Sequence, residues 1–204
     1  MKIAVIGATG NIGSKIMAEA LERGHDVTAI ARDTSKLPGH PRLSPQKGDA
    51  ADSAALASIV HGHEAVISSL PFLNVEPSVL CAALKKAGVK RLLVVGGAGS
   101  LNAPGGHGQL VDQPDFPVAW KDIALKGRDF LNHLKTEPTL EWTFLSPSAM
   151  IAPGERTGTF RTGKDDLLVD AAGNSHISQE DYAIAMLDEV EEPRHIRARF
   201  TVGY

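Results

Sequence analysis

Short apolar runs alternate with amphipathic stretches along most of this chain. The apolar runs are rich in β-branched and aliphatic residues, which is typical of buried parallel strands. They cover residues 2–6, 26–31, 64–70, 91–95 and 141–146. We expect the more polar residues 46–50 to close a short third strand. The amphipathic segments predict helices over residues 12–21, 53–60, 79–87 and 119–134. Strands alternating with helices predict an α/β fold, a Rossmann-type doubly wound parallel sheet whose strand ends share one edge.

The C-terminal quarter has a different pattern. Residues 159–171 alternate and end in a Gly-Asn pair, which predicts a small β-hairpin. Ser178 opens a last helix in the manner of a capping box, and residues 197–202 alternate as a final strand. A chain of 204 residues suits one domain, 1–204. We expect about 152–204 to form a small appendage on the substrate side, made of the hairpin, the helix and the last strand.

A glycine-rich turn follows the first strand and precedes the first helix, with the spacing Gly7-x-x-Gly10-x-x-Gly13. In a dinucleotide-binding turn, the first glycine permits the tight turn and the second lets the backbone approach a pyrophosphate. The third lets helix and strand pack closely. The start of the helix then offers free N–H groups to phosphate. The order strand, turn and helix therefore predicts nucleotide binding, and the alternative is a tight turn without a ligand.

The end of the second strand is where such folds meet the adenosine ribose. Arg32 stands there, and Thr34, Ser35 and Lys36 follow as further donors. An arginine accommodates a 2′-phosphate, so the sequence favours NADP(H) over NAD(H). Asp33 leaves the choice open, because it either caps a turn or binds the ribose hydroxyl of NAD. The alternative for Arg32 is a solvated surface charge.

Composition and charge exclude several classes of function. The formal net charge is −3 and no basic stripe is present, so we expect no nucleic-acid partner. No apolar run reaches the length of a membrane span, and we expect neither membrane insertion nor a signal peptide. Cys81 is the only cysteine, which fits a reducing cytoplasm. His61 and His63 have no further ligands at a suitable spacing, so we expect no metal site.

Several motifs together resemble one family. They are Gly7-Ala8-Thr9-Gly10-Asn11-Ile12-Gly13 and the segments at 48–52, 95–101, 142–147, 177–183 and 199–204. In these segments the chain resembles the atypical short-chain dehydrogenases/reductases that bind NAD(P). The resemblance is strongest to the bacterial NADH-flavin reductases, near the NmrA-like proteins and the biliverdin/flavin reductases. It covers nearly the whole chain, and it is more specific for fold and cofactor than for substrate.

The resemblance implies a cofactor site along the carboxyl edge of the sheet. The residues implied at the pyrophosphate are Gly7, Thr9, Gly10, Asn11 and Ile12. Those implied at the adenosine are Arg32, Asp49 and Ala50, although Asp49 fits a helix-entry turn equally well. Those implied around the nicotinamide and its ribose are Leu70, Gly96, Gly97, Pro147 and Ser148.

The chain departs from that family at the catalytic acid. Many members use a Tyr-x-x-x-Lys pair and a serine after the fifth strand. Here Lys126 matches the lysine, but Asp122 stands where the tyrosine belongs, and the serine position falls near Gly97 or Ala98. The only tyrosines are Tyr182 and Tyr204, both near the C-terminus. Asp122 and Lys126 are therefore the candidate catalytic residues, with roles unknown.

The missing tyrosine favours one kind of chemistry. Reducing a ketone benefits from an acid at the oxygen, whereas a flavin or quinone delocalises the incoming charge and takes its proton from solvent. We expect an NAD(P)H-dependent oxidoreductase that passes hydride to a small planar acceptor, with FMN or FAD as a substrate. Trp120 either stacks on such a ligand or packs in the core, and the loop at 101–117 is expected to cover the acceptor.

Two other functions fit the motifs less well. One is an NADP(H)-binding redox sensor or regulator that turns nothing over, although no partner-binding appendage is evident. The other is an epimerase- or dehydratase-like isomerase that uses NAD transiently and would normally need the tyrosine. The pattern leaves the physiological acceptor open, and also whether the protein is a monomer or a dimer.

Overall fold

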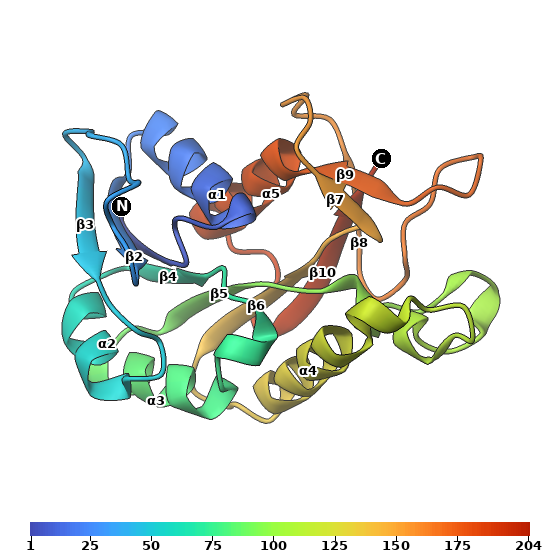
Figure 1. Cartoon of the computed structure of the whole chain (residues 1–204), viewed down its shortest axis with the longest axis horizontal. Helices are drawn as coiled ribbons and strands as arrows, with labels where there is room; N and C mark the ends of the chain where they lie inside the picture. The colour runs from blue at the N-terminus through green and yellow to red at the C-terminus, as the bar shows by residue number, and fades with distance from the viewer.

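The computed structural model describes all 204 residues and has one eight-stranded central sheet (Figure 1). Its strand order is β3-β2-β1-β4-β5-β6-β10-β8. The strands are β1 (Lys2–Ile6), β2 (Asp26–Ala31), β3 (Leu43–Lys47), β4 (Ala65–Ser68), β5 (Arg91–Val95), β6 (Glu141–Ser146), β10 (Ala198–Gly203) and β8 (Arg161–Gly163). All neighbours pair in parallel except β8, which runs antiparallel to β10 at one edge. The predicted doubly wound parallel sheet is therefore confirmed.

Five helices cover the two faces of the sheet (Figure 1). One face carries α1 (Asn11–Glu22) and α5 (Gln179–Glu191), and the other carries α2 (Ser53–Val60), α3 (Pro77–Ala87) and α4 (Val118–Lys135). Each face encloses its own cluster of 23 buried apolar residues. Because the central strands are buried on both faces, their sequences are apolar at nearly every position. None of the helices combines the length and the apolar character that crossing a membrane requires.

Local sequence explains where several helices begin and end. The Asp52 carboxylate accepts the backbone N–H groups of Ala54 and Ala55 at the start of α2, and the Ser178 hydroxyl accepts the N–H of Asp181 at the start of α5. Gly24 follows α1 with a φ of +78°, a conformation that favours glycine. These signals act within a few residues, which is why the sequence alone predicted the Ser178 cap.

Two predicted elements were wrong in part. The third strand spans Leu43–Lys47 rather than closing at 46–50, and it includes Pro45. Because β3 is an edge strand, it tolerates a residue without an N–H group. The predicted hairpin at 159–171 does not form: Arg161–Gly163 pairs with β10 instead. A separate two-stranded parallel sheet joins β7 (Met150–Ala152) to β9 (His176–Ser178).

Candidate cofactor and acceptor site

The turn between β1 and α1 is built from three glycines that serve different purposes. Gly7 has a φ of +81°, and a Cβ there would stand 2.4 Å from the Ser69 carbonyl oxygen. A Cβ on Gly13 would stand 2.2 Å from the Gly7 carbonyl oxygen. Gly10 is different, because its φ is −76° and its Cβ would meet only that same oxygen, at 3.3 Å. The fold itself therefore needs Gly7 and Gly13 more strictly than it needs Gly10.

The start of α1 is equipped to bind an anion. Thr9, Gly10 and Asn11 are exposed, and no side chain caps the free N–H groups of the first turn. That turn contains no carboxylate to offset the helix dipole. By contrast, α5 is capped by Ser178 and carries acidic residues in its first turn. Only α1 follows a glycine turn with its N–H groups and dipole open to a phosphate.

The residues expected at the adenosine lie at the exits of β2 and β3. The N–H of Gly48 donates to the Ala31 carbonyl at 3.1 Å, which holds the two exits together. Arg32 is exposed there and pairs with no carboxylate. The Asp33 carboxylate accepts the Ser35 N–H at 2.9 Å, and hydrogen bonds from Ser35 keep the pKa of Asp33 below its usual value. Asp33 thus caps its own turn, which was one of its two expected roles.

Sequence reasoning missed one cation at this end. Lys47 pairs in register with Ala31, so it ends β3 directly beside the residue that precedes Arg32. Lys47 and Lys36 both lie close enough to lower the pKa of Asp33 by their charge. The signal that could have found Lys47 is its place at the last position of the third strand, which was predicted three residues too late.

Asp49 and Ala50 follow β3 on the same edge. The Asp49 carboxylate accepts the Ala51 N–H at 3.0 Å and is exposed, as expected of a turn residue. Ala50 is buried in the apolar cluster beneath α2 and α3. Asp49 therefore fits the alternative role in a helix-entry turn, while its exposed position leaves it beside the adenosine end.

The expected nicotinamide end is made of the exits of β4, β5 and β6, which pack tightly against one another. A methyl group of Leu70 comes within 3.1 Å of the Cβ position on Gly7, so β4 exits against the glycine turn. The Gly96 N–H donates to the Leu145 carbonyl at 2.8 Å, and a Cβ on Gly96 would stand 2.5 Å from the Phe144 ring. Gly97 lies over the ring of Phe72, with 3.5 Å between its Cβ position and that ring. A side chain at Gly96 is excluded by the fold.

Pro147 and Ser148 follow β6 and are both buried. The Ser148 hydroxyl donates to the Val202 carbonyl at 2.9 Å. That bond ties the exit of β6 to the end of β10. The hydroxyl proton of Ser148 is therefore engaged within the protein.

The two candidate catalytic residues lie on α4. Asp122 and Lys126 are exposed and stand one turn apart. Neither tyrosine is placed to act as a catalytic acid in their stead. Tyr182 is fully buried, and its hydroxyl donates to the Leu145 carbonyl at 2.6 Å. Burial also raises the pKa of Tyr182. Tyr204 donates to an Asp181 carboxylate oxygen at 2.7 Å. No tyrosine hydroxyl is therefore free to protonate a substrate.

The loop at 101–117 is long, but side chains of α4 hold it in place. It contains short 3-10 turns at 104–106 and 110–112. The Arg128 guanidinium of α4 pairs with the Asp112 carboxylate at 2.9 Å, and the Lys121 ammonium donates to the Val111 carbonyl. The glycine-rich part of the loop borders a cavity of about 480 Å³ that also contacts residues 166–167.

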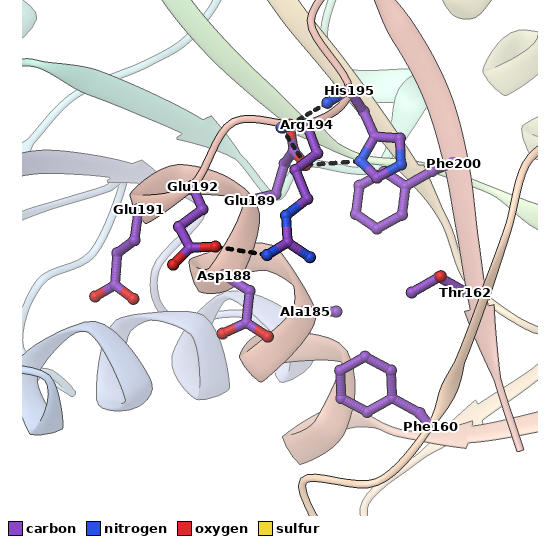
Figure 2. Close-up of a pocket in the computed structure, with 10 residues that line it drawn as sticks. All are labelled: Phe160, Thr162, Ala185, Asp188, Glu189, Glu191, Glu192, Arg194, His195 and Phe200. Atoms are coloured by element: carbon purple, nitrogen blue, oxygen red, sulfur yellow. Dashed lines mark hydrogen bonds and ion pairs between the residues drawn. The ribbon is translucent and has the colours of Figure 1, made fainter.

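A second cavity, of about 270 Å³, lies beside the end of α5 (Figure 2). It is bordered by the last turns of α5 and by the connection into the amino end of β10. Phe160 and Phe200 form its apolar wall, and acidic side chains surround its rim (Figure 2). Glu189 in this wall is bonded to His195 at 2.7 Å and to Arg91 at 2.8 Å, which links α5 to β5. This cavity is separate from the carboxyl edge.

The histidine pair after α2 has a structural explanation. His63 is buried, its Nε2 lies 2.7 Å from the Thr28 hydroxyl, and burial lowers its pKa. The Nδ1 of His61 lies 3.1 Å from the Ala87 carbonyl oxygen. The protein contains no group of three or more His, Cys, Asp or Glu side chains arranged to hold a metal ion.

Comparison with known proteins places this geometry in context. The profile of a family described as NAD(P)H-binding matches residues 7–193. The YwnB protein of Bacillus subtilis, described as uncharacterised, is 42% identical over 209 residues, which cover 99% of this chain and 98% of that protein.

Two solved structures are also similar over their full length. A Bacteroides thetaiotaomicron protein provisionally named an epimerase is 43% identical with a TM-score of 0.93, covering 100% of this chain and 96% of the other. A Streptococcus pneumoniae protein provisionally named an NADH-flavin reductase is 36% identical with a TM-score of 0.85, covering 100% and 99%. The likeness therefore extends over the whole of this chain.

Proposed function

The chain belongs to the NAD(P)H-binding family, and from that membership we propose that it is a reductase that passes hydride from NAD(P)H to a small planar acceptor such as a flavin or a quinone. The membership confirms the family expected from the glycine turn and the other motifs. The observation that supports a planar acceptor is that neither tyrosine hydroxyl is free to donate a proton. Tyr182 is buried, and Tyr204 is hydrogen-bonded to Asp181.

The carboxyl edge fits a dinucleotide at both ends. The uncapped start of α1 would hold the pyrophosphate, and the segments at Leu70, Gly96 and Gly97, the proposed nicotinamide passage, would hold the nicotinamide ribose. At the adenosine end, the cations Arg32, Lys36 and Lys47 outnumber the carboxylates Asp33 and Asp49, each of which already accepts a backbone N–H of its own turn. This balance favours a 2′-phosphate and hence NADP(H). When bound, the reduced nicotinamide supplies a hydride.

The acceptor follows from the proton balance. Hydride transfer delivers two electrons and one proton equivalent, and the acceptor needs one further proton. A ketone oxygen benefits from a positioned acid, which typically contributes about 10²–10⁴-fold to the rate. A flavin or quinone spreads the charge over its rings and can take the proton from water. The chain then needs only to align the two rings, which are about 3–3.5 Å apart in a reactive complex.

The names of the relatives point in two directions. That of the Streptococcus pneumoniae protein agrees with the proposal, whereas that of the Bacteroides thetaiotaomicron protein points to an isomerase. An epimerase that borrows a hydride from a carbinol carbon must also remove the proton from the carbinol oxygen and return it later, and this generally requires an acid–base residue. Asp122 is the one candidate for such a role at the tyrosine's position, and it is exposed. The geometry therefore supports the reductase better.

Steady-state oxidation of NADPH tests the proposal. The reaction is followed with no acceptor, with FMN and with a quinone, and each condition is repeated with NADH. We expect oxidation that depends on the acceptor and that saturates at lower NADPH than NADH concentrations. NADPH binding by calorimetry without turnover on any acceptor would contradict the proposal and favour the redox sensor.

A further inference from the structure

Trp120 stands in the first turn of α4 with 63% of its surface exposed. That exposure excludes the core-packing role that the sequence left open. We infer that Trp120 is the platform on which the planar acceptor stacks. This inference rests on the proposed function, because it assigns a residue to the acceptor half of the same site.

The packing of α4 determines which way Trp120 faces. The face that packs on the fold includes Gly127, whose Cβ position lies 2.8 Å from the Phe72 ring, and Ala124, whose Cβ lies 2.8 Å from that of Gly99. Trp120 precedes Ala124 by four residues and Gly127 by seven, so it lies on that same face. Because Trp120 is exposed although it lies on the packed face, the first turn of α4 projects beyond the residues on which the rest of the helix packs.

The start of α4 extends beyond the carboxyl edge of the sheet. In Figure 1, β5 leaves the sheet toward this end of α4. Helical side chains lean toward the N-terminus, so the indole of Trp120 covers the turn before its own Cα, still farther from Gly99. Phe72 connects the two regions, since its ring contacts both Gly127 and Gly97. The indole is therefore placed on the acceptor side of the proposed nicotinamide passage.

Several large apolar side chains besides Trp120 are exposed after the carboxyl ends of strands. Large apolar residues are exposed at six positions, and four of them follow the ends of β4, β5 and β6. These four are Leu73 at 59%, Val118 at 89%, Trp120 at 63% and Met150 at 67%. Trp120 is the one aromatic residue among the four, and its indole offers a planar acceptor a ring to stack on.

Fluorescence can report this contact independently of turnover. The chain has two tryptophans, and Trp142 is buried with 3% exposure. In a Trp142→Phe background, Trp120 is the only indole. We expect FMN, added to this variant in the presence of saturating NADP⁺, to quench the emission of Trp120 saturably. The quenching midpoint should match the FMN affinity measured from FMN's own fluorescence.

Two substitutions of Trp120 distinguish aromatic stacking from a purely apolar contact with the acceptor. Trp120→Phe keeps an aromatic face and should hold the acceptor KM within about threefold, whereas Trp120→Leu keeps only apolar area and should raise it roughly tenfold. NADPH affinity should stay unchanged in both. Ile196→Ala is the matched control, because it removes an exposed apolar side chain after α5, away from this edge, and should change neither value. Circular dichroism checks that each variant is folded.

The outcomes distinguish this inference from the proposed function. Failure of wild-type turnover on every acceptor would defeat the function, while the quenching titration would still test Trp120. Normal turnover with an unchanged acceptor KM in Trp120→Leu, and no quenching, would overturn the inference alone. A shift of Trp120 emission with protein concentration in the absence of acceptor would also overturn it, because a second copy would then cover the indole.

Discussion

Gly10 and Gly13 stand three residues apart, yet their substitutions should have different effects. Gly13→Ala places a methyl group 2.2 Å from the Gly7 carbonyl oxygen, which is backbone and cannot rotate away. Overpacking of this kind costs about 1–3 kcal/mol, and for a chain of this size 1 kcal/mol lowers Tm by about 2–4 °C. Gly10→Val has an ordinary extended backbone, with φ −76° and ψ 168°, and meets only the Gly7 oxygen at 3.3 Å. Because that contact is tight and valine is a poorer N-cap than glycine, its Tm should fall, but by less than that of Gly13→Ala.

The same pair separates folding from cofactor binding. A side chain at Gly10 occupies the space through which the pyrophosphate reaches the N–H groups of α1. Losing two such charge-assisted bonds, at about 1.5–3 kcal/mol each, weakens binding by roughly 150-fold or more. Calorimetric titration with NADPH, together with thermal unfolding of both variants, measures the two effects. Tight NADPH binding by folded Gly10→Val would refute the placement of the pyrophosphate, and an unchanged Tm in Gly13→Ala would refute the packing argument.

Three further predictions concern specificity, catalysis and stability. Arg32→Ala should weaken NADPH binding roughly tenfold to a hundredfold and leave NADH nearly unchanged, since only NADPH carries the 2′-phosphate; equal losses in the two titrations would remove Arg32 from that role. Asp122→Asn and Tyr182→Phe should each keep most of the reductase rate, and kcat should vary little between about pH 6 and 8, because no protein acid is required. A thousandfold loss in Asp122→Asn with NADPH still bound would identify Asp122 as the acid and move carbonyl substrates ahead of flavins. Burial alone would raise the pKa of Glu137, but hydrogen bonds from Lys85 and Thr139 outweigh it and lower that pKa to about 2. Because the folded value lies below the unfolded one of 4.5, this stabilisation is complete above pH 4.5 and is lost as pH falls toward 2. Urea unfolding should therefore show a steeper acid loss in wild type than in Glu137→Gln.

The elements that the sequence predicted correctly depend on neighbours within a few residues. Buried runs such as Arg91–Val95, the glycine turn and the Ser178 cap belong to this group. The elements it missed depend on partners far along the chain. Arg161–Gly163 is a strand only because β10 lies beside it, and the pairing of Met150–Ala152 with β9 joins segments about two dozen residues apart.

The candidate site shows the same division. Gly7, Gly10 and Gly13 were assigned distinct roles from their spacing, and the contacts at Gly7 and Gly13 agree with the packing roles. Lys47 escaped notice because its place depends on the register of β3 against β2. Trp120 stayed ambiguous because helix periodicity gives its face but not the point at which the helix passes the edge of the sheet.

Hydride transfer to a planar acceptor is the central claim, and an anaerobic single-turnover experiment tests it most directly. Enzyme saturated with NADPH is mixed with FMN, and the absorbance bands of both molecules are followed together. The account predicts that one equivalent of FMN is reduced per NADPH oxidised, and that deuterium at the transferring position of nicotinamide C4 slows both signals equally. NADPH that is bound yet keeps its absorbance in the presence of FMN, and likewise of a quinone, would contradict it.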